Sequence, residues 1–182
     1  MTRNKFFSIL SLTALTATGL FAKNPMVGGH EMFPNKNIVE NAVNSADHTT
    51  LVAAVKAAGL VETLQGTGPF TVFAPTNAAF AKLPGGTVDT LLKPENKATL
   101  TKVLTYHVVA GKWSSDDLMK MIKKGNGTAE LKTVSGGKLW AMMEGKSIVL
   151  KDEKGGIAKI SQSNVNQSNG VIHVIDTVAM PN

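Results

Sequence analysis

The chain lacks cysteine altogether, and only 5% of its 182 residues are aromatic. The missing cysteines exclude disulfides, thiolate metal sites and cysteine nucleophiles. Because aromatic side chains are few, the core has to be built mainly from Val, Leu, Ile, Ala and Met. A chain of this length can bury one such core and hold its fold by packing alone. Walker and dinucleotide-binding glycine motifs are also missing, so nothing in the sequence indicates a nucleotide site.

Charged residues are scarce as well: they make up 18% of the chain, with a formal net charge of +6. Most lysines are scattered, and the one cluster, Lys120, Lys123 and Lys124, ends a predicted helix, where cations suit the helix dipole. This cluster lacks the interleaved aromatic residues that nucleic-acid sites use, so we expect no nucleic-acid partner. The charge is compatible with weak attraction to an acidic polysaccharide or an anionic surface.

The first residues differ in kind from the rest of the chain. Arg3 and Lys5 precede the apolar stretch Phe6–Leu15, and a small residue, Ala22, follows at a suitable cleavage position. Serines and threonines interrupt the apolar stretch, which is too short for a membrane span. We therefore expect residues 1–22 to be a signal peptide and the mature protein to be exported, to the periplasm or cell exterior, and not integral to the membrane. Residues 23–36, rich in Pro and Gly, are predicted to form a flexible N-terminal arm.

From residue 37 onward, short helices and strands follow one another. Apolar residues at helical spacing predict helices over 37–46, 49–58 and 95–105, with Gly59 ending the second. A buried strand is predicted over Thr71–Ala74, followed by a helical turn that Thr76 or Asn77 caps. A further strand is predicted over Tyr106–Val109, and then a helix that starts at Ser114 or Ser115 and ends at Gly125.

Beyond Gly127 the pattern changes to strands and glycine turns. Strands over 128–134, 138–143, 146–151 and 157–161 predict an antiparallel meander, and residues 162–168 are expected to form a polar loop. The last apolar stretch, Val171–Ala179, contains five branched aliphatic residues and only two strongly polar ones, His173 and Asp176. This composition predicts a closing strand that is buried on both faces and needs a sheet around it.

Five polar residues lie inside or beside these apolar runs. Buried polar groups must be hydrogen-bonded, so we expect these five to form a structural network that ties the first strand-helix corner to the closing strand. They are Thr76, Asn77, His107, His173 and Asp176. The alternative, a His/Asp site for metal or catalysis, finds little support because no HxH or HExxH spacing exists. We accordingly expect no metal and no cofactor.

Three blocks of the sequence, in this order and spacing, resemble the signature blocks of the fasciclin family, the FAS1 or βig-h3 domain. They are TVFAPTNAAF (71–80), YHVVAG (106–111) and NGVIHVIDTVAMP (169–181). The resemblance covers residues 37–181. It implies an α+β FAS1 fold, an antiparallel-rich wedge of about seven strands with several helices packed on one side. It also implies a secreted or surface protein of cell adhesion or matrix attachment.

In adhesion-type members of this family, a Tyr-His block has been proposed to bind receptors, and Tyr106 and His107 match it. A core role for the two residues is the other interpretation. Integrin-type motifs are not recognisable, since Lys93-Pro94-Glu95 stands where an acidic Pro-Asp-Ile segment would be sought. The expected partner is therefore an unidentified surface or matrix protein or polysaccharide. An exported module for a small ligand or carbohydrate is the alternative function.

No enzyme is expected. Ser135 lacks the preceding glycine of a nucleophile elbow, and its Ser-Gly-Gly context predicts a hairpin turn. The neighbouring carboxylates of Asp116 and Asp117 stand at a predicted helix start, where they serve the cap and the dipole better than acid-base chemistry.

Overall fold

The computed structural model describes residues 24–182, so the predicted signal peptide over 1–22 lies outside the described residues. None of the helices within 24–182 is long and apolar enough to span a membrane. The α-helices are α1 (Ile38–Ala42), α2 (Thr49–Ala58), α3 (Val61–Gln65), α4 (Asn77–Ala81), α5 (Thr87–Leu91), α6 (Lys97–Tyr106) and α7 (Ser115–Lys124). The strands are β1 (Met26–Val27), β2 (His30–Glu31), β3 (Phe70–Pro75), β4 (Val108–Ala110), β5 (Thr128–Lys132), β6 (Lys138–Glu144), β7 (Ser147–Lys151), β8 (Ile157–Gln167) and β9 (Gly170–Ile175).

A seven-stranded sheet runs in the order β4-β3-β9-β8-β7-β6-β5. Every neighbouring pair is antiparallel except β3 and β9, which run parallel and in register from Phe70 opposite Gly170 to Pro75 opposite Ile175. The sequence predicted this antiparallel-rich α+β architecture, and the structure confirms it. The prediction of a closing strand with two buried faces is also confirmed, because all six residues of β9 are buried.

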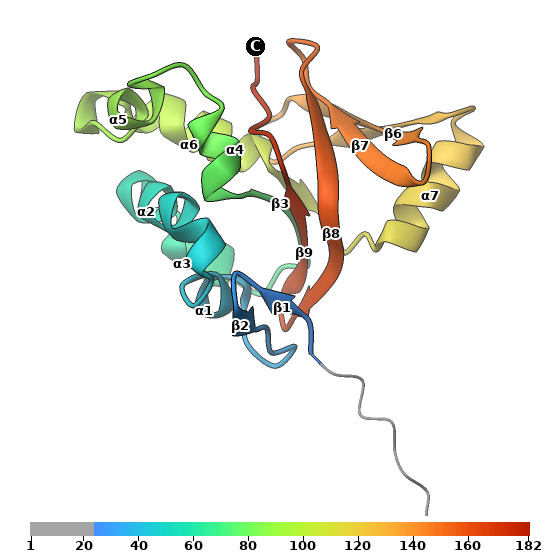
Figure 1. The fold of residues 1–182 in the computed structure, drawn as a ribbon, viewed down its shortest axis with the longest axis horizontal. Coiled ribbons are helices and arrows are strands. Elements are labelled where there is room, and N and C mark those ends of the chain that lie inside the picture. Colours follow the sequence, from blue (N-terminus) through green and yellow to red (C-terminus); the bar gives the residue numbers. More distant parts are fainter. Residues whose placement is uncertain (1–23) are drawn as a thin grey trace, which may run out of the picture.

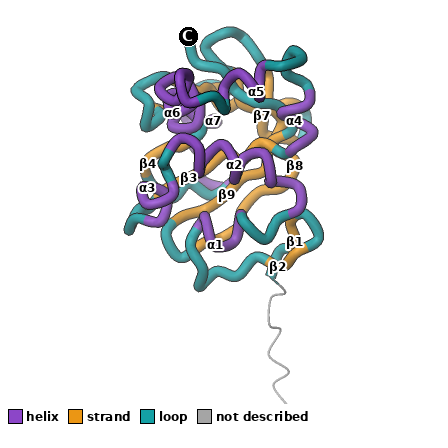
Figure 2. Tube along the Cα trace, turned by 90° about the vertical axis from the view of Figure 1, so that its left-hand side faces the viewer, coloured by secondary structure: helices purple, strands orange, loops and turns teal. Residues whose placement is uncertain are grey.

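Two separate cores lie on opposite faces of β3 and β9. Alternation along β3 directs Val72 and Ala74 into one core and Phe73 into the other, and β9 does the same with Val174 and Ile175. We call them the helical core, which α1–α6 cover, and the α7 core, which α7 covers together with β5–β7 (Figure 1). Figure 2 shows α2 lying across the face of β3 and β9.

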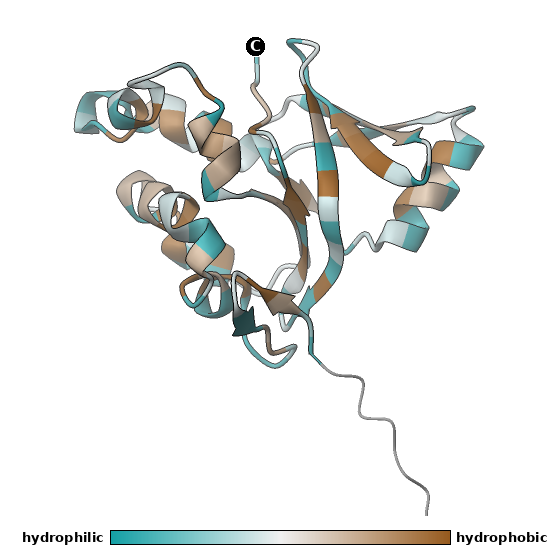
Figure 3. Cartoon of the chain, in the orientation of Figure 1, coloured by the Kyte–Doolittle hydropathy of each residue, from teal (hydrophilic) through white to brown (hydrophobic). Residues whose placement is uncertain are grey.

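Side-chain hydrogen bonds to backbone N–H groups cap the starts of several helices. Asn37 and Ser114 form capping boxes with Glu40 and Asp117, in which each side chain bonds the other residue's backbone N–H. Thr76 caps α4 by accepting the N–H of Ala79. The capping box of α7 orients an amphipathic helix whose polar side faces outward and whose apolar side packs on the sheet (Figure 3).

Three elements differ from the sequence prediction. Helix α3 was not predicted, because its five residues are too few for a recognisable period. Tyr106 ends helix α6, so strand β4 begins only at Val108. The predicted loop over 162–168 is wrong: β8 continues to Gln167 through register shifts between 160 and 165. The mostly polar composition of this stretch hid the strand, which bends there from β7 onto β9.

The prediction of a flexible arm over 23–36 is corrected for the residues that the structure describes. Strands β1 and β2 pair as a hairpin, and Gly28 and Gly29 supply the two positive φ angles of its turn. Val27 and Met32 are buried in the helical core. These two side chains bury apolar surface, which the Pro- and Gly-rich composition had not revealed.

Candidate functional site

Tyr106 and His107 are neighbours in the chain, yet they serve different parts of the fold. Tyr106 is fully buried in the α7 core, where its hydroxyl donates to the Lys138 carbonyl at 2.5 Å and accepts the Glu153 N–H at 3.1 Å. Burial raises the pKa of Tyr106 to about 12. His107 caps the end of α6 and is 3% exposed. Both side chains are buried, so neither is exposed for direct contact with a partner, and the geometry favours the core role for the two residues.

The imidazole of His107 is fully hydrogen-bonded in its neutral form. Its Nδ1 lies 2.8 Å from the Val103 carbonyl, and its Nε2 lies 3.0 Å from the backbone nitrogen of Ala179. A carbonyl can only accept and an N–H can only donate, so the proton is on Nδ1. Burial lowers the pKa of His107 to about 4. The bond to Ala179 joins the Tyr-His block to the segment after β9.

His173 has the opposite tautomer. Its Nε2 donates to the Trp113 carbonyl at 2.8 Å, and its Nδ1 accepts the Asn164 N–H at 3.4 Å. Its ring also stacks on Phe73, with ring centroids 5.7 Å apart. Burial lowers the pKa of His173 as well. This residue therefore fastens β9 to the start of α7 and to the bulged part of β8.

The other three predicted network residues are bonded elsewhere. Asn77 holds the start of α2, accepting the Thr50 N–H at 3.0 Å and donating to the Ala46 carbonyl at 2.9 Å. Asp176 accepts the Lys159 N–H at 2.9 Å, and its backbone carbonyl accepts a hydrogen bond from Lys82 at 2.6 Å. Thr76 caps α4. The structure gives the five residues separate hydrogen-bonded sets and no bond between any two of them.

Sequence reasoning missed the side chains that fasten the helical layer to β8 and β9. The amide of Asn169 accepts the Ile38 N–H at 3.1 Å and donates to the Leu64 carbonyl at 2.7 Å. Asn41, which is fully buried, bonds the backbone of Phe33 and the side chain of Gln167. Asn and Gln carry no sequence signal for such roles, because their burial depends on contacts distant in the chain.

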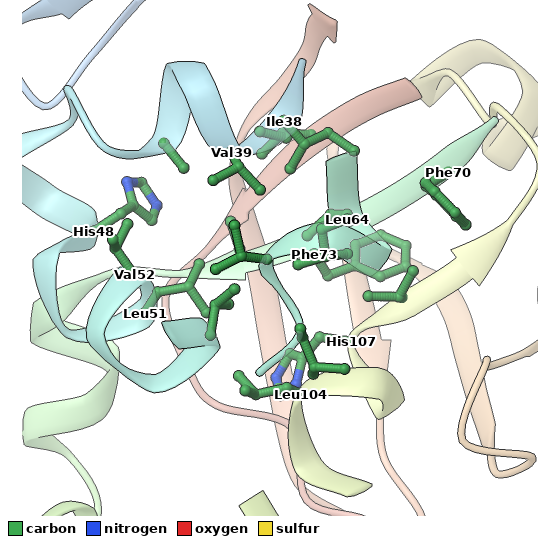
Figure 4. A pocket seen from close by; sticks show the side chains of 18 of the residues that line it. Ile38, Val39, His48, Leu51, Val52, Leu64, Phe70, Phe73, Leu104 and His107 are labelled. Atoms are coloured by element: carbon green, nitrogen blue, oxygen red, sulfur yellow. The ribbon is translucent and has the colours of Figure 1, made fainter. Parts of the chain in front are cut away.

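A cavity lies within the helical core, between the helices α1, α2, α3 and α6 and the strands β3, β4 and β9. Its volume is about 80 Å³. Figure 4 shows how side chains from these elements converge on it. Aliphatic and aromatic residues make up most of its wall, including Ile38, Val39, Leu51, Val52, Leu64, Phe70 and Leu104. His48 and His107 also border the cavity, but the surface that faces it is almost entirely apolar.

His48 differs from the other buried polar residues in how its side chain is hydrogen-bonded. It is 3% exposed, and its Nδ1 is paired with the Ser45 hydroxyl at 2.8 Å. Among residues 24–182, its Nε2 is the one buried side-chain nitrogen or oxygen without a hydrogen bond of standard geometry, although the Ala74 backbone lies within reach of the ring. Burial lowers the pKa of His48, and the hydrogen bond to the Ala74 backbone and the Asp47 carboxylate oppose this only in part. The sequence offered one clue, a serine three residues before the histidine.

A second region of interest is the face of β5–β8 that points away from α7. Buried Leu131, Leu139 and Ala141 point toward α7, so the alternate positions point outward. On β6 the half-buried Trp140 lies opposite Lys151 of β7 and Glu130 of β5. On the same face Lys132 and Lys138 are directly opposed, and Lys138 also pairs with Glu130 at 3.0 Å.

Serine and aspartate side chains, which act as catalytic groups in many enzymes, form structural hydrogen bonds in this fold. The Ser135 hydroxyl bonds that of Thr133 within a hairpin turn. Hydrogen bonds from the Ser114 side chain and backbone lower the pKa of Asp117, which belongs to the cap of α7. Among residues 24–182, no group of three or more His, Asp or Glu side chains is arranged to hold a metal ion.

Comparison with known proteins adds to this geometry. The family model of the fasciclin domain matches residues 46–181. Protein sll1483 of Synechocystis sp. is 49% identical over 145 residues, which are 79% of this chain and 73% of that protein. The immunogenic protein MPB70 of Mycobacterium bovis is 39% identical over 77% of this chain and 66% of its own length. A FAS1 domain pair from the insect cell adhesion molecule fasciclin I superposes with a TM-score of 0.71 at 18% identity, covering 80% of this chain and 51% of the other.

Proposed function

Because this chain belongs to the fasciclin domain family, we propose that it is an exported, non-enzymatic protein that attaches to acidic polysaccharide at a cell surface or in a matrix. Two observations support the attachment role. The signal-like sequence of residues 1–22 supports export. The fold neighbour fasciclin I is named a cell adhesion molecule.

The proposed attachment surface is the outward face of β5–β8. Here the indole of Trp140 lies between strands that also present Lys132, Lys138 and Lys151. An indole offers a flat apolar surface on which a sugar ring can stack, and its N–H serves as a hydrogen-bond donor. Lysine ammonium groups attract the carboxylates or sulfates of an acidic polymer. Lys138, opposite Lys132, already pairs with Glu130 at 3.0 Å, so Lys132 and Lys151 are the cations on this face that would mainly attract a bound anion.

The buried histidines favour a non-enzymatic role. A general base has to reach its substrate in an open site and titrate near the working pH. His107 and His173 are buried, both of their ring nitrogens are bonded, and burial lowers the pKa of each. These residues use their hydrogen bonds to hold the fold together.

Binding to immobilised alginate, a polymer of uronic acids, tests the proposal against neutral dextran. We expect the protein to bind alginate and not dextran, with affinity that falls as salt concentration rises. Trp140→Ala and the pair Lys132→Gln/Lys151→Gln should each weaken binding at least about tenfold, equivalent to 1.4 kcal/mol.

The matched control is Lys123→Gln/Lys124→Gln, which removes the same charge from the exposed end of α7. It should leave alginate binding within about twofold, because α7 covers the opposite face of this part of the sheet. Equal binding to dextran, or an equal loss in the control pair, would show that the outward face is not the attachment surface.

A further inference from the structure

The segment that follows β9, residues 178–182, is held to the rest of the domain by side chains. Within residues 24–182, none of its backbone groups bonds to another backbone group. Its N–H groups bond instead to three titratable side chains: that of Ala179 to His107 Nε2 at 3.0 Å, that of Met180 to Asp152 Oδ2 at 2.9 Å, and that of Asn182 to Glu153 Oε2 at 3.0 Å. Each of these bonds therefore depends on an acceptor that can bind a proton.

The segment lies where the two cores meet. Val178 is buried in the helical core and Ala179 in the α7 core. In Figure 1 the segment continues from β9, with helices on one side and β8 on the other. Its acceptors also come from two sides, since His107 follows α6 while Asp152 and Glu153 belong to the turn between β7 and β8. Release of the segment would uncover apolar surface of both cores and leave every strand pair of the sheet in place.

A charged His107 and the bound segment exclude each other. The Val103 carbonyl fixes the proton of the neutral imidazole on Nδ1, which leaves Nε2 free to accept. A second proton would occupy Nε2 and face the Ala179 N–H, so that two donors would oppose each other. The imidazolium would also lie in the buried junction between the cores, where a charge is costly. The segment has to leave before His107 can be charged at low cost.

His107 is the first of the three acceptors to respond as the pH falls. An ordinary imidazole titrates near pH 6.5, and carboxylates titrate about two units lower. Hydrogen bonds from the backbone N–H groups of Asn182 and Lys138 lower the pKa of Glu153 further. In mildly acidic solution the carboxylates therefore still accept their hydrogen bonds, and only the bond to His107 is at risk.

The groups around His107 decide how strongly release and proton uptake are coupled. Burial lowers the pKa of His107 to about 4 while the segment is bound, and the Asp152 carboxylate opposes this in part. The Tyr106 phenol, which is uncharged at these pH values, meets the ring of His107 edge-on. Lys102 of α6 lies beside the segment, where it bonds the Asn182 carbonyl. Once the segment leaves and water reaches the imidazole, its pKa returns toward the ordinary value, so acid favours release.

We propose that residues 178–182 form an acid-released segment, which detaches from α6 and from the β7–β8 turn when His107 is protonated while the sheet stays folded. The device is local because the segment has no strand partner among residues 24–182. One proton is taken up per release, so each pH unit below about 6.5 should favour the released form about tenfold. The device does not use Trp140 or Lys151 of the attachment face.

Hydrogen exchange of single amides in the full mature chain, followed by NMR between pH 7 and 5.5, tests the proposal. The amides of Ala179, Met180 and Asn182 should be less protected than those of β9 at every pH. Their protection factors, which already correct for the intrinsic pH dependence of exchange, should fall about tenfold over this range. In His107→Gln the side chain keeps an acceptor near the Nε2 position but cannot be charged, so protection of the segment should not change with pH.

The matched control is His173→Gln, which replaces another buried imidazole that does not bond the segment. In this variant the protection of residues 179–182 should still fall with pH. If His107→Gln does not fold, the wild type provides a second measurement, because the ring signals of His107 should titrate together with the amide shifts of the segment.

Two results would overturn the proposal. Equal protection of the segment and of β9 would mean that the segment leaves only when the whole domain unfolds. Protection of the segment that stays constant with pH in the wild type would remove His107 from the device. Alginate binding through Trp140 is measured separately, so either proposal can fail without the other.

Discussion

The two cores of this domain share β3 and β9 but differ in how completely they are filled. The α7 core contains fully buried Phe73, Tyr106 and Leu118, and the hydroxyl of Tyr106 has two backbone partners. The helical core contains a cavity of about 80 Å³. Native interiors are close-packed and their polar groups are paired, so the α7 core follows the rule and the helical core departs from it.

This difference separates structural residues from candidate ligand-binding residues. Tyr106 and His107 form the most recognisable block in the sequence, yet both are buried and fully bonded. The cavity, by contrast, is lined mainly by residues outside the three signature blocks. We infer that the signature residues hold the domain together, and that sites for partners lie in the less filled core and on exposed faces.

The largest effect is expected from Tyr106→Ala. Removing an aromatic ring from a filled core leaves a cavity and leaves the Lys138 carbonyl without its hydrogen bond. The free energy of unfolding should therefore fall by about 3–5 kcal/mol. Tyr106→Phe is the control that keeps the ring and should cost about 1–3 kcal/mol for the lost hydrogen bonds. Denaturant unfolding measures both. Attachment to alginate per folded molecule should be unchanged, and a loss of attachment without a loss of stability would assign Tyr106 a direct adhesive role.

The loss of stability at acidic pH is expected to be nearly as large as the loss caused by Tyr106→Ala. Folding lowers the pKa of His107 from 6.5 to about 4, so the unfolded chain binds more protons between these values. Stability should therefore be full above pH 6.5 and fall by about 3 kcal/mol on acidification to pH 4. His48 and His173 shift in the same direction and add to the loss. Denaturant melts between pH 7 and 5.5, where the carboxylates stay largely ionised, report mainly on the histidines, and a flat profile there would contradict their neutral burial.

His173→Ala should destabilise the domain by about 1–3 kcal/mol. The change strands the Trp113 carbonyl and the Asn164 N–H and removes the stacking on Phe73. Thermal unfolding measures it. An unchanged melting temperature would mean that these bonds add nothing to the stability of the α7 side.

The smallest change in stability is expected when the same substitution, Val to Leu, is made once in each core. Val52→Leu adds a methylene beside the cavity and should stabilise the domain by up to about 0.8 kcal/mol. Val109→Leu adds the same group to the filled α7 core and should cost about 1–3 kcal/mol. Chemical denaturation of both variants provides the comparison. Equal and unfavourable changes at both sites would show that the helical core has no usable space.

The sequence predicts the elements whose signals are local. The aliphatic run of β9 requires burial on both faces, and the capping box at Ser114 defines the start of α7. The first part of β8 was predicted, but its continuation over 162–167 escaped prediction because this polar half pairs with β9 only after register shifts. The predicted polar network also has a different form, since His107, His173 and Asp176 each find backbone partners instead of one another.

The candidate sites were harder to predict for a physical reason. The cavity of the helical core depends on how α2 and β3 come together around it, which no local pattern encodes. Trp140 reaches its lysine neighbours through strand register alone. Both sites are products of contacts between elements distant in the chain.

The most direct test of the difference between the cores is the map of amide shifts on titration with 1-hexanol. We predict that the shifted residues belong to α1–α3, β3 and the adjoining end of α6, around the cavity. Residues of α7 and of β5–β7, around the filled core, should stay unchanged. Shifts centred on α7 and β6, or equal shifts in both cores, would contradict the conclusion that only the helical core is incompletely filled.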